Sequence, residues 1–439
     1  MWSQLWEFVE RWLYAPDADA AGASGRLRRG LRYPVAVLRD LAGGELNLRA
    51  MGLVYTTLLA IIPAVALSFV VLRAFGLHRD LEPLLLEFFR PVGEGAADLT
   101  RRVMRFADGV RTGLVGSVGF ALLLWTLMGT VKKVEDCFNF VWHVRRPRRF
   151  ARRVAEYVGL LVAGPVVIVA VIGFSKLALD SANALAVAEL PFLARRTRLA
   201  IELAPYAIVT ALFMAIYVII PNTRVRPGPA FGGALAAGVL WAATGKLFTA
   251  MVVYTSRLTL IYAGFAIIGA VLLWTYLGWL ILLAGAQLSF YLQHPGFLRL
   301  GLGRPRLSAV ESEQLGLNLM ALVARDRAAG RPLWTVDTLC RALQLPGVAV
   351  ADAVEALERT GLLRDADGER LALARDAGDI RLTQILDAMR APQPGRMVFR
   401  MTPLPAVREL QSGFDAAWRA ACGTQTLRDL IDAAPPDAV

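Results

Sequence analysis

Six long apolar runs constrain this sequence more than any other feature. They occupy residues 51–72, 113–131, 156–179, 201–220, 231–254 and 263–292. A helix rises about 1.5 Å per residue, so each run can cross a hydrocarbon core of roughly 30 Å. The runs predict an all-α polytopic membrane protein with six transmembrane helices over residues 46–295. Buried helices of a soluble protein are disfavoured, because only 19% of the residues are charged and too little polar surface would remain.

The distribution of arginine predicts how the chain crosses the membrane. Arginines cluster before the first run, between the second and third runs, and between the fourth and fifth. All three clusters fall on one side if six spans alternate, and the positive-inside rule makes that side cytoplasmic, with both termini inside. Residues 73–112 oppose this, since they would lie outside and yet carry arginines, although acidic residues are interleaved with them. We therefore expect a multi-pass protein of the bacterial inner membrane.

The N-terminal segment, residues 1–45, precedes the first apolar run. Its first half is amphipathic, with Trp2, Trp6 and Trp12 at helical spacing. These side chains suit either the membrane–water boundary or packing against the protein's own surface, and the sequence does not separate the two. We interpret the segment as cytoplasmic or interfacial.

The net charge of +12 raises the question of nucleic-acid binding. Much of the basic excess lies beside the apolar runs, and such clusters usually contact anionic lipid headgroups. Membrane lipids are therefore the expected partners, and nucleic acid is not. The candidates for cytoplasmic lipid contact are Arg145, Arg146, Arg148 and Arg149.

Signatures of catalysis are scarce. The three histidines stand far apart, and the sequence has no HExxH, GxSxG, Walker or strand-linked GxGxxG motif. We expect no enzyme activity, no cofactor and no metal site. Carboxylates that converge from separate helices would leave no such motif, so an enzyme stays open as an alternative.

Three sequence blocks resemble the YihY/BrkB family of bacterial inner-membrane proteins. They are "LRAMGLVYTTLLAIIPAVALSF" at 48–69, "LWTLMGTVKKVEDCFNFVWHVRRPRRF" at 124–150 with Asn139 and Trp142, and the region from "PGPAFGGALAAGVLWAATGKLF" to "LLAGAQLSF". The resemblance implies a six-helix protein of the envelope that moves lipids or lipophilic solutes. Some relatives carry an old label as a ribonuclease, which these residues do not support. The chain departs from the family at Ala263, within a usual Tyr-Gly pair, and at Gln287, where relatives often have an acid.

Lys246 is a cation inside the fifth apolar run. Its helical neighbours at three and four positions are the small residues Ala242, Ala243, Thr249 and Ala250. Because small residues line helix–helix interfaces in membranes, we expect Lys246 on the packed face, paired with Glu202 or, second, Asp180. Glu135 and Asp136 lie toward the inner side and fit less well. A structural clamp and a transport site both remain open, with Tyr254 and Gln287 as further pathway candidates.

Residues 305–392 form a second, polar region. The pattern is helix, short helix, helix, then a turn at 366–368 between two short strands, which resembles a winged helix, a small α+β fold. Thr335 or Asp337 is the expected N-cap of the short helix. The third helix carries Asp352, Glu355 and Glu358 against Arg359, a balance that opposes DNA phosphates. A protein partner or self-association is therefore favoured, and residues 393–439 are expected to be a flexible tail with one amphipathic stretch at 405–421.

These features together predict a membrane protein that transports or flips a lipid or amphiphilic solute. A non-transporting scaffold that acts through its cytoplasmic domain is the alternative. A membrane-bound ribonuclease is a third, disfavoured possibility.

Overall fold

The computed structural model describes the chain in several ranges. They are 12–13, 23–74, 86, 97–98, 100–101, 114–144, 191–255, 260–298, 307–343, 345–366, 370–391 and 404–433. In parts of these ranges, including 191–202, 251–255 and 260–268, only the backbone is described. The chain divides into two compact units: a helical unit, Asp40–Leu292, and a terminal unit that combines Met1–Arg39 with Gln293–Val439.

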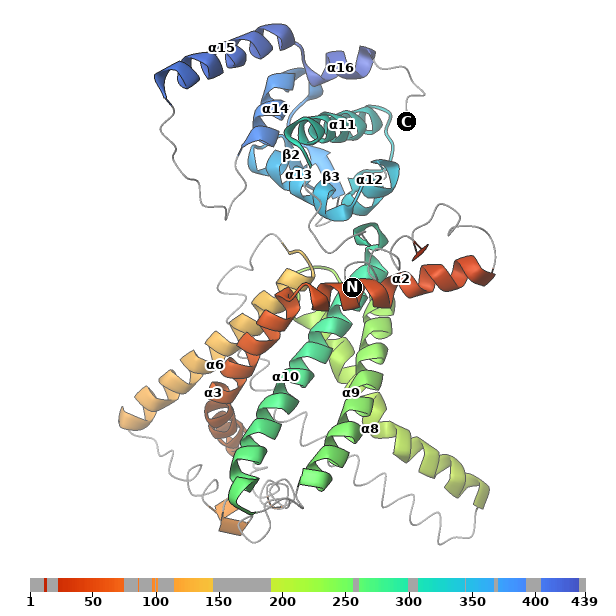
Figure 1. Ribbon diagram of the computed structural model, residues 1–439, viewed down its shortest axis with the longest axis vertical. Coiled ribbons are helices and arrows are strands. Elements are labelled where there is room, and N and C mark those ends of the chain that lie inside the picture. The colour runs from red at the N-terminus through yellow and green to blue at the C-terminus, as the bar shows by residue number, and fades with distance from the viewer. Residues whose placement is uncertain are drawn as a thin grey trace. The chain divides into compact units, whose positions relative to one another are not determined.

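Long helices make up the described part of the helical unit (Figure 1). They are α3 (Glu45–Ala74), α6 (Leu114–Val141), α8 (Pro191–Ile219), α9 (Pro227–Thr255) and α10 (Leu260–Gln293), and α2 (Ala23–Ala42) precedes them. The five helices overlap five of the six apolar runs, and the run at 156–179 lies outside the described residues. Within the described part, Pro227–Ala250 and Gly269–Gln293 are long and apolar enough to cross a membrane.

Contacts at one end of the helical unit give the directions of these helices. The Arg49 guanidinium, near the start of α3, lies 3.5 Å from the ring centroid of Phe140, near the end of α6. The rings of Phe138 in α6 and Tyr217 in α8 are 6.2 Å apart, so these two helices end side by side. We call this the polar end: α3 and α9 begin there, and α6, α8 and α10 end there.

Glycine allows α8, α9 and α10 to pack closely at the polar end. A Cβ added at Gly233 of α9 would lie 2.3 Å from the carbonyl oxygen of Gly285 in α10. The fully buried Tyr217 of α8 donates a 2.9 Å hydrogen bond from its hydroxyl to the Leu282 carbonyl of α10. The helices α9 and α10 therefore meet at backbone distance, and the Tyr217 side chain joins α8 to them.

Aromatic side chains continue the α8–α9–α10 packing away from the polar end. Trp241 of α9 meets Phe213 of α8 at a ring distance of 5.8 Å and Trp274 of α10 at 4.9 Å. Phe248 contacts the same Trp274 ring at 4.9 Å. Trp241 and Phe248 therefore face the neighbours of α9 along this stretch, and their positions decide where Lys246 can point.

The terminal unit contains a helical layer and a small sheet. Its helices are α11 (Ala309–Ala328), α12 (Val336–Leu343), α13 (Gly347–Arg359), α14 (Leu382–Arg390), α15 (Pro405–Cys422) and α16 (Leu427–Ala433). Its strands β1 (Trp334–Thr335), β2 (Leu363–Asp365) and β3 (Arg370–Leu373) form an antiparallel sheet in the order β1-β3-β2. The helices α11, α12 and α13 and the antiparallel strands β2 and β3 follow the order predicted from the sequence, whereas residues 367–369, where the predicted turn falls, are outside the described residues. Their shared core includes Leu319, Met320, Leu339, Val350 and Leu357.

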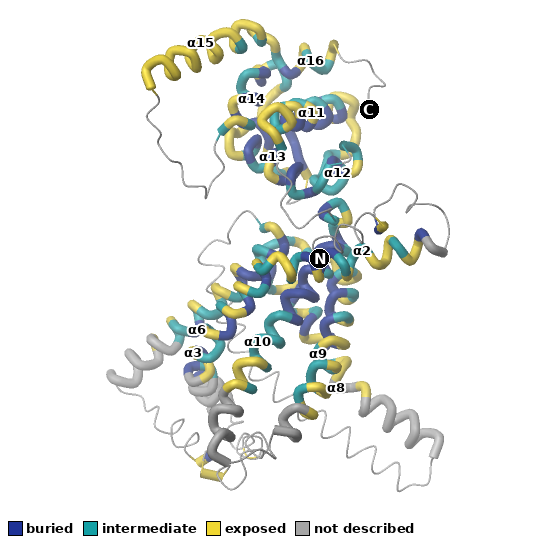
Figure 2. Tube along the Cα trace, in the orientation of Figure 1, coloured by how far each residue is buried: buried dark blue, intermediate teal, exposed yellow. Residues whose placement is uncertain are grey.

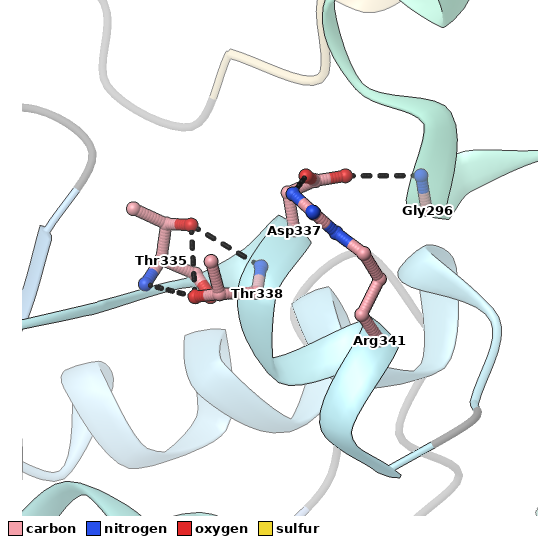
Figure 3. A network of polar contacts seen from close by, with 5 residues as sticks. All are labelled: Gly296, Thr335, Asp337, Thr338 and Arg341. Atoms are coloured by element: carbon pink, nitrogen blue, oxygen red, sulfur yellow. Dashed lines mark hydrogen bonds and ion pairs between the residues drawn. The ribbon is translucent and has the colours of Figure 1, made fainter.

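Thr335 and Asp337, the two predicted N-cap candidates of the short helix α12, form different contacts (Figure 3). Thr335 is the N-cap: its hydroxyl accepts the Thr338 backbone N–H at 3.2 Å, and the Thr338 hydroxyl accepts the Thr335 N–H at 2.9 Å. Asp337 instead accepts the Gly296 backbone N–H at 3.0 Å and forms an ion pair with Arg341. Asp337 therefore ties the short helix η4 (Pro295–Phe297) to α12.

Phe297 completes this attachment. Its side chain is only 7% exposed, and Gly347 at the start of α13 lies directly against its ring. Burial raises the pKa of the neighbouring Cys340 thiol to about 12, with Asp337 as the second cause. Thiol reagents should therefore leave Cys340 unmodified near neutral pH, because the thiolate is the reactive form.

Candidate functional site

Three polar residues join separate segments at the polar end. Glu135 of α6 is buried, with 1% of its surface exposed. The Asn139 amide, one helical turn later, donates from Nδ2 to the Glu135 carboxylate at 3.3 Å. Its Oδ1 accepts the Asn222 backbone N–H at 2.9 Å, in the turn between α8 and α9. One side chain therefore links a buried carboxylate to the turn that connects two other helices.

Further contacts at the polar end involve the beginning and the end of the helical unit. The Tyr291 hydroxyl at the end of α10 donates to the Asp40 carboxylate in α2. The neighbouring Phe290 ring meets Trp142 edge-on at 5.8 Å and stacks on His143 at 4.9 Å. A buried carboxylate and a tyrosine–carboxylate pair thus lie at the end of the unit where α6 and α10 stop.

His143 ends α6 in an unusual conformation. Among the described non-glycine residues, His143 alone has a positive backbone φ angle, of 51°. The Val144 N–H bonds to the Asn139 carbonyl at 2.8 Å and the His143 N–H to the Phe140 carbonyl at 3.1 Å, which is the pattern of a helix stop normally made with glycine. Histidine at this position costs stability, and its stacking on Phe290 is the compensation that the structure shows.

Lys246 does not occupy the packed face, so that prediction is wrong. The side chain is exposed, as are Ala243, Thr249 and Ala250 around it, whereas Ala242 is half-buried. The reason is that Trp241 and Phe248 pack on Trp274, which turns the small residues outward. Small size alone therefore misidentified the packed face of α9 around Lys246.

Of the other predicted pathway residues, the structure describes the side chain of Gln287 but not those of Glu202, Asp180 and Tyr254. Gln287 is buried, with 5% exposed, in α10 between Gly285 and Ser289. Glu202 and Tyr254 lie in α8 and α9, but their side chains are outside the described part. Asp180 and the cluster Arg145, Arg146, Arg148 and Arg149 are also outside the described residues. The predicted pairing of Lys246 with Glu202 or Asp180 therefore stays a prediction.

The comparison with protein families decides where this chain belongs. A family model described as "Virulence factor BrkB" matches residues 37–300, which include the whole helical unit, Asp40–Leu292. The chain belongs to the BrkB family. The polar-end residues Asp40, Glu135, Asn139, Asn222 and Tyr291 all lie inside the matched range.

Curated relatives of this BrkB-family chain are named as membrane proteins. A "UPF0761 membrane protein" of Azotobacter vinelandii is 28% identical over 373 residues, which cover 84% of this chain and 85% of the relative. One of Chlorobium limicola is 28% identical and covers 77% and 75%, and one of Methylibium petroleiphilum is 26% identical and covers 88% of each chain. These relatives and the family match support a membrane protein.

Two solved structures are similar to a smaller part of the BrkB-family chain. They are Staphylococcus aureus CymR, at 21% identity over 28% of this chain and 98% of that one, and CymR (YrzC), the global cysteine regulator of B. subtilis, at 20% identity over 30% and 100%. Both have a TM-score of 0.23.

Sequence reasoning about the BrkB block noted Asn139 but missed the polar end as a site. It considered Glu135 only as a poor partner for Lys246. The available signal was the spacing of four between Glu135 and Asn139, which places both on one helical face. The contact of Asn139 with Asn222, 83 residues away, has no sequence signal of its own.

Asn139→Ala should destabilise the helical unit by about 1–3 kcal/mol, because the buried Glu135 loses a donor and the Asn222 N–H loses this acceptor. Thermal unfolding of the detergent-solubilised protein would measure the loss. Asp136→Ala is the matched control, since Asp136 is exposed on the same helix. Equal unfolding temperatures for the two variants would contradict a linking role for Asn139.

Proposed function

We propose that this BrkB-family protein is a six-span transporter that moves a lipid or amphiphilic solute across the bacterial inner membrane. The observation that carries the proposal is Lys246, a cation exposed on the outer surface of α9 within the candidate span Pro227–Ala250. The protein acts on membrane lipids without catalysing a reaction and does not bind nucleic acid.

Helix direction supports six spans. Since α6 and α8 end side by side at the polar end, they run in the same direction. The apolar run 156–179 lies between these two parallel helices in the sequence and is long enough to cross a membrane, although it is outside the described residues. We therefore infer that it is the sixth span. Arg224 and Arg226 lie in the turn between α8 and α9, at the polar end, so the positive-inside rule makes that end cytoplasmic, with both termini inside.

The position of Lys246 favours contact with lipid over a clamp between helices. The side chain is exposed, and so are its neighbours Leu247, at 72%, and Val239, at 61%. A lysine at the centre of a membrane helix costs about 2.5–3.5 kcal/mol, so a cation on an apolar outer surface needs a counter-charge. The phosphate of an anionic headgroup supplies one as the lipid passes along α9.

Lys246→Met should slow the movement of an anionic lipid by roughly tenfold, equivalent to about 1.4 kcal/mol of lost headgroup attraction. The measurement is the transbilayer movement of fluorescent phosphatidylglycerol in proteoliposomes. Leu247→Met is the matched control, because it changes an exposed neighbour without removing charge. The variant itself should fold normally, since it removes a costly charge.

The transport proposal fails if Lys246→Met and Leu247→Met move lipid at the wild-type rate. It also fails if the wild-type protein moves no lipid beyond empty vesicles. Lys246→Arg separates charge from shape, since it keeps the charge and should retain most of the rate on an exposed face with room for a guanidinium.

A scaffold that acts through the terminal unit is the second candidate. We infer that residues 307–390 form a winged helix, supported by the order of α11, α12 and α13 and the sheet order β1-β3-β2. Asp352 and Arg359 are exposed on α13, and Glu355 and Glu358 are partly exposed beside them. This acidic surface favours a protein partner over DNA phosphates.

A further inference from the structure

The helix α15 exposes an apolar face along the terminal unit. Exposed fractions reach 63% for Leu410 and 67% for Phe414, and Val407 on the same face is 43% exposed. Figure 2 shows nearly the whole of α15 in the colour of exposed residues. Isolated apolar side chains on a surface are ordinary, but a continuous stripe over several turns marks a contact surface.

The same helix is held firmly at its C-terminal half. The Arg390 guanidinium of α14 lies 4.4 Å from the ring centroid of Trp418, and the Trp418 indole donates to Asp415 at 3.2 Å. The next helix, α16, is anchored by the fully buried Leu427. The C-terminal half of α15 is therefore attached to the rest of the terminal unit, which lowers the entropic cost of presenting the stripe to a partner.

The stripe contains a groove and also a large side chain that could fill the same groove on another copy. Its shallow groove is lined by Ala406, Glu409, Leu410, Gly413, Phe414 and Ala417. The first four are spaced at i, i+3, i+4 and i+7, which is the spacing of a hole that receives one side chain from a facing helix. Phe414 projects from the same stripe and is large enough to fill such a hole.

We propose that α15 binds α15 of a second copy of this chain in an antiparallel pair. A two-fold axis between Gln411 and Ser412 places Phe414 of each copy at the Ala406–Gly413 hole of the other. The same axis sets Leu410 opposite Gly413, so that a large side chain meets a small one. A two-fold interface requires one patch to be complementary to itself, and this stripe meets that requirement.

The charges on α15 favour a helix over a lipid surface as the occupant. The positions that border the stripe carry Ala406, Gln411, Gly413, Trp418 and Ala420, with no lysine or arginine among them. Helices that lie in a membrane interface place cations there. Both arginines of α15 and Asp415 lie outside the stripe. Glu409 lines the hole, but the two-fold axis sets it opposite Phe414 of the other copy and not opposite the other Glu409.

Cross-linking in native membranes tests the pair. Gln411→Cys lies near the two-fold axis, and the matched control Ser412→Cys points away from the stripe at nearly the same height. Both carry Cys422→Ser, whereas the buried Cys137 and Cys340 remain. We expect dimers from Gln411→Cys in at least roughly tenfold excess over the control, and Phe414→Ala added to Gln411→Cys should remove most of that excess.

Two results would overturn this interface. The first is equal cross-linking of Gln411→Cys and Ser412→Cys, or none from either. The second is a monomeric Gln411→Cys protein in nanodiscs in which a nitroxide at Leu410 reports immersion in lipid, because α15 would then bind the membrane. Lipid transport is measured separately, so a failure of this pair leaves the Lys246 result unaffected.

Discussion

Gly233→Ala should unfold the helical unit at a markedly lower temperature than the wild-type protein. The new Cβ would lie 2.0 Å from the Ser289 hydroxyl and 2.3 Å from the Gly285 carbonyl oxygen. The hydroxyl can rotate away, but the carbonyl belongs to the backbone of α10, so the two helices must separate. Overpacking of this kind typically costs about 1–3 kcal/mol, and the backbone contact places this variant at the upper end.

The control for Gly233→Ala is Gly129→Ala in α6. Nothing lies within 4 Å of a Cβ added there, and the residue is exposed within a helix. Alanine should therefore stabilise α6 by about 0.5–1 kcal/mol through backbone entropy alone. Thermal unfolding in detergent, followed by tryptophan fluorescence, compares the two. A Gly233→Ala protein as stable as Gly129→Ala would show that α9 and α10 are not in backbone contact.

Phe297→Ala should destabilise the terminal unit by about 3–5 kcal/mol, the usual cost of removing a buried phenylalanine side chain. The ring is 7% exposed and lies against Gly347, so its loss leaves a cavity where η4 meets α12 and α13. The helical unit should keep its unfolding temperature, because Phe297 belongs to the other compact unit. Limited proteolysis as a function of temperature would report the two units separately.

Val310→Ala is the control for that experiment. Val310 is 62% exposed on α11, so its removal should change the stability of the terminal unit by less than about 0.5 kcal/mol. If Phe297→Ala and Val310→Ala lower the melting temperature of the terminal unit equally, η4 is not part of its core.

The terminal unit shows how far local patterns predict structure. The sequence predicts Thr335 or Asp337 as the N-cap of α12. Thr335 is the cap, and Asp337 forms a hydrogen bond to a different segment. Candidates for a cap are recognised within four residues, so the sequence contains that information. Which of the two residues caps the helix was not decided locally. The Asp337 carboxylate accepts the backbone N–H of Gly296, which is 41 residues away.

The sequence by itself determined the number and length of the apolar runs, because hydropathy over about 20 residues is a local property. It did not determine which side of α9 is buried. In a membrane both the interior and the lipid face are apolar, so the periodicity that orients a helix in water is weak. Only packing against Trp274 turned Trp241 and Phe248 inward and left Lys246 exposed.

The polar end is likewise a product of tertiary structure. Glu135 and Asn139 are recognisable as a pair on one turn of helix, but their value as a site comes from the Asn222 N–H that Asn139 accepts. That contact spans 83 residues and exists only because α6 and α8 end side by side. A hydrogen bond between such distant residues depends on the path of every helix between them, which no local pattern records.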